Sequence, residues 1–86
     1  MKTQVTEYQG VKVINPKNSR LVKTAINWLI KHNDADRLRN IADGEGDEKA
    51  YNKANRRCES TFDKYLDAVD QLPKNQIKLI ENSNLY

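Results

Sequence analysis

One stretch of the chain, residues 47–72, organises the rest, and it reads DEKAYNKANRRCESTFDKYLDAVDQL. Apolar side chains recur in it every seven residues, with small residues between them: Tyr51, Ala54, Cys58, Thr61, Tyr65, Ala68 and Leu72. At 100° per residue these positions share one side of a helix. We therefore predict a long amphipathic helix, in which Cys58 packs as a small hydrophobe. Its apolar face must meet the rest of the chain or a second copy.

The opposite side of this predicted helix changes charge along its length. The first half is basic and the end is acidic: Lys49, Lys53, Arg56, Arg57 and Lys64 against Asp63, Asp67 and Asp70. Lys and Arg are common on solvated helix faces, so the charges alone do not imply a ligand.

The N-terminal residues predict a β-hairpin. Thr3–Tyr8 and Val11–Ile14 alternate between apolar and polar residues, and Gln9-Gly10 between them suits a tight turn. The hairpin must pack on other elements, because an isolated hairpin is marginally stable. Asn15-Pro16 ends the second strand.

Two shorter helices are expected between the hairpin and residue 47. Asn18 or Ser19 caps the first, at about residues 20–32. Asn33 then caps a second, at about residues 34–42, with Leu38 and Ile41 among its inward residues and Arg37 and Arg39 pointing elsewhere. The glycines of segment 43–46 stop it, and Asp47 caps the long helix that follows.

Pro73 suits the first position of a last helix, with Ile77 and Ile80 inward. The predicted fold is α+β and mostly helical: one domain, 1–86, with an N-terminal β-hairpin followed by three or four helices, of which the third is long. Hydrophobic residues make up 37% of the 86 residues, enough for a folded domain. The core is nevertheless small, so a homodimer through the Tyr51–Leu72 helix is expected.

The single cysteine excludes an internal disulfide and favours a reducing compartment. The N-terminus lacks the apolar run of a signal peptide, and no segment approaches the ~18–20 apolar residues of a membrane span. We expect a cytoplasmic protein without a membrane partner.

The charge distribution is the main functional signal. Residues 1–40 hold eight basic and three acidic residues, whereas residues 41–86 hold seven and nine. Residues 9–33 contain five basic residues and no acidic one. Clustered cations suit the phosphate backbone of RNA or DNA. The candidate contacts fall into two patches: Lys12, Lys17, Arg20, Lys23 and Lys31, followed by Arg37, Arg39, Lys53, Arg56 and Arg57.

No motif indicates catalysis, a metal or a cofactor. His32 lacks a second His or Cys ligand for zinc, and an EF-hand that began at Asp43 would need a Glu where Ala54 stands. We therefore expect no enzyme, no metal site and no cofactor. Two alternatives remain open: a protein-interaction inhibitor or adaptor without nucleic-acid binding, and a small ribonuclease that uses His32.

In length, basic balance and stretches such as 18–31, the chain resembles small accessory proteins of T4-like phages. Within that group it is similar to the phage-encoded RNA-binding inhibitors of the ToxN endoribonuclease. The resemblance implies an RNA-binding, dimeric protein of the host cytoplasm that keeps a host or toxin protein inactive as an anti-defence factor. It assigns a role to no individual residue.

Overall fold

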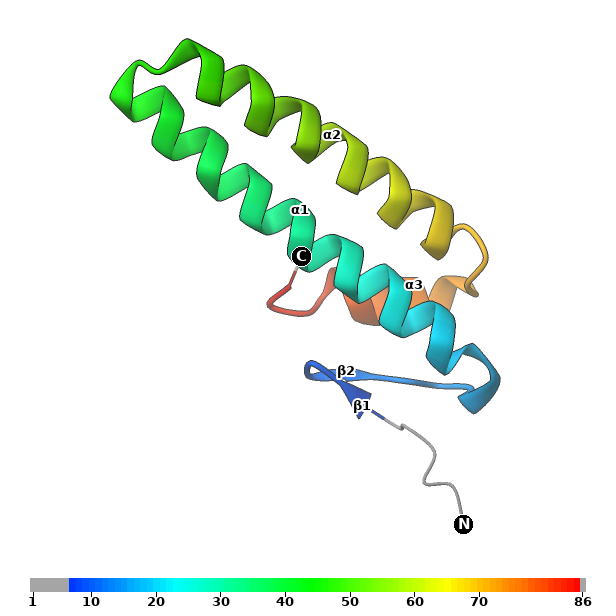
Figure 1. The fold of residues 1–86 in the computed structure, drawn as a ribbon. Coiled ribbons are helices and arrows are strands. Elements are labelled where there is room, and N and C mark those ends of the chain that lie inside the picture. The colour runs from blue at the N-terminus through cyan, green and yellow to red at the C-terminus, as the bar shows by residue number, and fades with distance from the viewer. Residues whose placement is uncertain (1–6, 86) are drawn as a thin grey trace.

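A computed structural model describes residues 7–85 and contains a long helical hairpin with smaller elements at one end. The elements are β1 (Glu7–Tyr8), β2 (Val11–Lys12), the 3-10 turn η1 (Pro16–Asn18), α1 (Ser19–Glu45), α2 (Glu48–Val69) and α3 (Lys74–Glu81). Figure 1 shows α1 and α2 side by side and antiparallel, with α3 and the strands near the start of α1. We call that end the base and the turn between α1 and α2 the tip.

The predicted fold class is confirmed, since a two-stranded antiparallel hairpin precedes a mostly helical chain. The predicted residues Thr3–Thr6 of the first strand lie outside the described residues. None of the helices described is long and apolar enough to cross a membrane.

The two predicted helices at 20–32 and 34–42 are in fact the single helix α1. Asn33 does not cap a new helix; its side-chain amide instead donates to the carbonyl oxygen of Leu85. The two acidic residues that follow Asn33 make ion pairs with the arginines three residues further on, Asp34 with Arg37 and Asp36 with Arg39. Such pairs support a continuing helix. The long predicted third helix is therefore α2, and the described residues contain three α-helices.

The end of α1 lies at Gly46, later than predicted. Gly46 adopts the left-handed conformation, with φ of 70°, and its N–H donates to the carbonyl of Asp43. The N–H of Asp47 donates to the carbonyl of Ala42. These two bonds form a Schellman motif, which ends a helix at a glycine. Asp47 then caps α2 as predicted, because its carboxylate accepts from the N–H of Ala50 at 3.1 Å.

Most of the core lies at the base, where α1, α2, α3 and β2 meet. Its buried members are Val11, Val13, Val22, Ala25, Ile26, Leu29, Tyr65, Ala68, Val69, Leu72 and Ile80. Towards the tip the buried residues are small: Ala35 and Ala42 on α1, Ala54 and Cys58 on α2. The apolar face predicted for residues 51–72 thus packs against α1 within the chain, and a homodimer through that face is not observed or tested.

Two residues predicted to point inward do not. Leu38 is 43% exposed and Ile41 is 50% exposed. The alanines of α1 contact α2 instead, and α3 and the strands lie too far towards the base to cover the tip (Figure 1).

The strand β2 is tied to α3 by one buried side chain that the sequence did not single out. Gln76 is fully buried. Its Oε1 accepts from the N–H of Ile14 at 2.9 Å, and its Nε2 donates to the carbonyl of Lys12 at 2.8 Å. The amide therefore satisfies one carbonyl of β2 and the N–H of Ile14, two residues after the strand.

Replacing Gln76 with Ala should lower the free energy of unfolding by about 2–3 kcal/mol, because it leaves the N–H of Ile14 and the carbonyl of Lys12 without their hydrogen-bond partner. Urea unfolding followed by circular dichroism measures this change. Gln71→Ala is the matched control, since Gln71 is exposed and its side chain donates only to the carbonyl of Asp67, one turn earlier in the chain. Equal destabilisation by the two substitutions would contradict the bridging role of Gln76.

Candidate nucleic-acid interface

The α1–α2 pair has two long sides, and they differ in charge. Residues seven apart return to nearly the same side of a helix. One side carries Thr24, Lys31, Leu38 and Glu45 of α1 together with Ala50, Arg57 and Lys64 of α2 and Gln71 in the turn after it. We call it the groove face, because both of its ends are hollowed. The other side, which we call the network face, carries Asp36, Asp43 and Glu59.

The base end of the groove face is built around Trp28. The ammonium nitrogen of Lys31 lies 4.5 Å from the centre of the Trp28 ring, and that of Lys64 lies 5.4 Å from it. A cation over an indole ring is held by the ring quadrupole. Two lysines from two different helices therefore converge on one aromatic side chain. The hollow beside them has a volume of about 240 Å³ and is lined by Leu21, Thr24, Trp28, Lys64, Asp67, Ala68 and Gln71.

Neither of these ammonium groups is neutralised by a carboxylate. Within residues 7–85 the ion pairs are Arg37–Asp34 and Arg39–Asp36, both inside α1. Lys31 and Lys64 are exposed, so their charge is available to a ligand that approaches the groove face.

The tip end of the groove face combines cations with exposed apolar side chains. A groove of about 370 Å³ is lined by Leu38, Ile41, Ala42, Glu45, Ala50, Lys53, Ala54 and Arg57. The alanines form its floor between the helices, while Lys53 and Arg57 line it from α2. Arg57 and Lys64 are seven residues apart, about 10 Å along the helix, so the two hollows share one row of cations.

The first predicted patch, which includes Arg20, Lys23 and Lys31, is interrupted by the β-hairpin. The Tyr8 hydroxyl donates to Oδ1 of Asn27 at 2.7 Å, and its ring lies 5.8 Å from the Lys23 ammonium. Arg20 is exposed at the start of α1, on the base side of this contact. Lys12 and Lys17 are exposed on β2 and η1, apart from the α1–α2 row.

The prediction that Arg37 and Arg39 form part of a free basic patch is not supported by their contacts. Arg37 bonds to Asp34 at 2.7 Å. Arg39 was expected to point away from the core, but its side chain is only 29% exposed. It is paired with Asp36 and donates to Oδ1 of Asn55 at 3.2 Å. Both charges are already matched within the chain.

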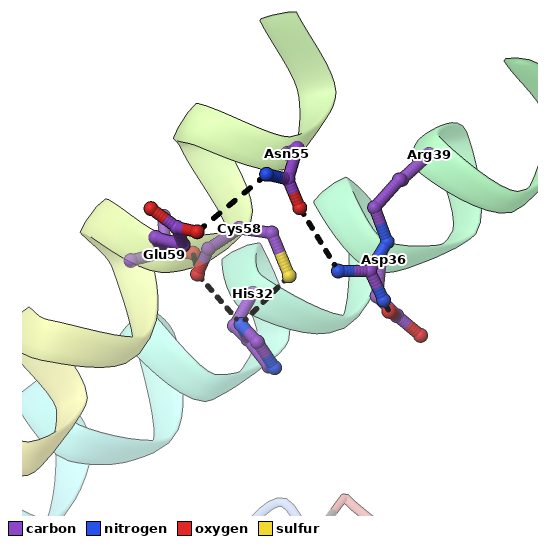
Figure 2. A network of polar contacts seen from close by, with 7 residues as sticks. His32, Asp36, Arg39, Asn55, Cys58 and Glu59 are labelled. Carbon is purple, nitrogen blue, oxygen red and sulfur yellow. Dashed lines mark hydrogen bonds and ion pairs between the residues drawn. The ribbon is translucent and has the colours of Figure 1, made fainter. Parts of the chain in front are cut away.

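On the network face, His32 is anchored to α2 (Figure 2). Its Nδ1 lies 2.9 Å from the carbonyl oxygen of Cys58 and 3.4 Å from the Cys58 sulfur. A carbonyl can only accept, so Nδ1 carries the proton. The imidazole ring also contacts Phe62, with the ring centres 4.9 Å apart. His32 therefore joins the two helices, and its Nδ1 is not placed to accept a proton from the thiol.

Cys58 has the surroundings of a packed thiol. It is 4% exposed, which confirms the predicted burial. Burial raises the pKa of the thiol, Arg39 opposes that rise, and Asp36 and Glu59 add to it. A raised pKa disfavours the thiolate, which is the nucleophilic form.

The described residues contain no group of three or more His, Cys, Asp or Glu side chains that could hold a metal ion. Comparison of the chain with protein-family models, with curated proteins and with solved structures finds no match. The interface is therefore assigned from its own geometry.

Sequence reasoning missed two of the residues at the centre of the groove face. Lys64 was left out of the candidate contacts, although it follows Arg57 by seven residues and so shares its side of the helix. Trp28 was not among the candidate contacts either, and its two lysine neighbours, Lys31 and Lys64, lie on different helices far apart in sequence. Only the packing of α1 on α2 brings them together.

Cys58 should react with iodoacetamide at pH 8 at least about tenfold more slowly in the folded protein than in urea, because folding both buries the thiol and raises its pKa. The rate of alkylation followed by mass spectrometry measures this. Free cysteine, tested in buffer and in urea, controls for the solvent. Equal rates in the folded and unfolded protein would contradict the packed environment.

Proposed function

We propose that the protein binds the phosphate backbone of a nucleic acid, with RNA favoured, along the groove face, and that it does so without catalysis. The observation that carries this proposal is the pair of exposed ammonium groups, Lys31 and Lys64, that converge on Trp28 without a carboxylate partner among the described residues. Lys53 and Arg57 extend the same row towards the tip. Cations arranged along one surface are the electrostatic requirement for a polyanion.

Backbone recognition fits this surface better than base reading. Base-specific single-strand binders stack bases on free aromatic rings. Here Trp28 is half-buried and two ammonium groups lie over its ring. The Trp28 ring holds the two ammonium groups in place and leaves little free surface on which a base could stack. If the four cations each contact a phosphate, the log–log salt dependence of single-strand binding should have a slope of about −3.

One observation favours a second candidate function, that of a protein-interaction inhibitor or adaptor. Leu38 and Ile41 are exposed beside Lys53 and Arg57 in the tip groove, and apolar residues beside cations suit an acidic protein. This candidate requires no affinity for RNA at about 0.15 M salt. The resemblance to phage inhibitors is compatible with either candidate, since it implies both an RNA and a host or toxin protein as partners.

Neutralising the two converging lysines, Lys31→Gln with Lys64→Gln, should weaken binding to a single-stranded RNA about tenfold at ~0.05 M salt and should reduce the salt slope by about 1.4. Fluorescence anisotropy of a labelled oligonucleotide measures both quantities. Trp28 is the only tryptophan, so its emission should also change when the wild-type protein binds.

The matched control removes the same charge from α3, by Lys74→Gln with Lys78→Gln, and should change the affinity less than about twofold. Equal losses in the two double variants would show that only net charge matters and would contradict the groove face as the site. The bound RNA should be recovered intact. Cleavage that His32→Ala abolishes would support the ribonuclease alternative instead.

A further inference from the structure

The outer side of α2, opposite α1, carries a charge pattern of which the nucleic-acid proposal uses only Lys53. Lys49, Arg56, Asp63 and Asp70 follow one another at intervals of seven, and Lys53, Ser60 and Asp67 lie between them. All seven side chains are exposed. The middle of this row lines one shallow hollow of α2, together with two residues that flank the row, Glu59 and Lys64. We call the row the charge stripe.

The spacing of the charge stripe is that of a helix–helix seam. Its steps of four and three residues keep seven positions in line along α2, as the a and d positions do in a coiled coil. Here the positions are charged and not apolar. The half before Ser60 is basic, and the half after Ser60 is acidic.

Within the stripe itself this order of charges is unfavourable. Neighbours along the stripe at three or four residues carry like charges, as Lys49 and Lys53 do, and such pairs destabilise a helix. The basic half also lies near the N-terminus of α2 and the acidic half near its C-terminus, which is the wrong way round for the helix dipole. Among residues 7–85 no stripe residue has an ion-pair partner. An opposite charge from outside the chain would relieve this arrangement.

We propose that the charge stripe binds the charge stripe of a second copy of this chain, with the two α2 helices antiparallel and the twofold axis at Ser60. In that register Lys49 meets Asp70 of the second copy, Lys53 meets Asp67 and Arg56 meets Asp63. Because the interface is isologous, each pair occurs twice. The small side chain of Ser60 lets the two helices approach at the axis.

The order of the charges selects this arrangement over others. In a parallel pairing, the basic half of one stripe would face the basic half of the other, and the two acidic halves would also face each other. A shift of one heptad in either direction would place Arg56 on Arg56 or Asp63 on Asp63 of the second copy. Like charges directly opposed across an interface suppress the wrong pairing.

One flank of the dimer bears on nucleic-acid binding. On the side of the groove face, Lys64 comes level with Arg57 of the second copy, and these like charges weaken the dimer. A phosphate strand held between them would relieve that repulsion and would span both copies. Exposed ion pairs contribute little each, so we expect the dimer alone to be weak and salt-dependent, with the stripe setting register and orientation.

The test uses the full chain, freed of nucleic acid, so its outcome is independent of RNA binding. An acidic variant carries Lys49→Asp with Arg56→Asp, and a basic variant carries Asp63→Lys with Asp70→Lys. Neither variant changes Lys31, Lys53, Arg57 or Lys64. Both place charges that suit the ends of α2 better than the native ones, so both should fold, which circular dichroism verifies.

Sedimentation equilibrium at ~0.01 M and ~1 M salt reports the association. The wild type should dimerise with rising concentration at low salt and should dissociate at high salt. Each variant alone should raise the dissociation constant for self-association at least about tenfold, and an equimolar mixture of the two should form a heterodimer. A mixture that associates no better than its components would overturn the proposal. So would a wild type that stays monomeric, or variants that dimerise like the wild type.

Discussion

The packing of α1 on α2 through small side chains is the constraint on which the rest of the structure depends. Ala35 and Ala42 face Ala54 and Cys58 towards the tip, and side chains of this size let two helices lie close over several turns. Small side chains bury little apolar area, however, so polar contacts add to the seam. His32 reaches the carbonyl of Cys58, and Arg39 reaches Asn55, which fixes the two helices in register (Figure 2).

The contact between α1 and α2 separates the remaining side chains into those of the groove face and those of the network face. On the groove face it brings Lys31 of α1 and Lys64 of α2 over the same ring, a meeting that neither helix could make alone. On the network face it buries the thiol of Cys58, and the half-buried imidazole of His32 bridges the two helices. The two side chains best suited to catalysis, His32 and Cys58, thus contribute to the packing of the helices. The unpaired cations remain on the surface.

The elements with strong local signals could be predicted from the sequence. The heptad of apolar and small residues identified α2 and its buried side, the Asp47 cap identified its start, and the alternation around Gly10 identified the hairpin. The break at Asn33 was wrong, because Asn and Asp can begin a helix but also sit inside one when arginines pair with them three residues later. The exposure of Leu38 and Ile41 could not be predicted, since periodicity marks an apolar side and does not show whether another element covers it. The Gln76 bridge depends on contacts more than sixty residues apart.

The central functional claim is that nucleic acid lies along the groove face, and amine footprinting tests it most directly. The protein is labelled with an acylating reagent with and without a single-stranded RNA at low salt, and the modified lysines are read by mass spectrometry. Lys31, Lys53 and Lys64 should be protected by the RNA, while Lys74 and Lys78 on α3 should react as they do in its absence. Protection confined to Lys12 and Lys17, or spread equally over all the lysines, would contradict the claim.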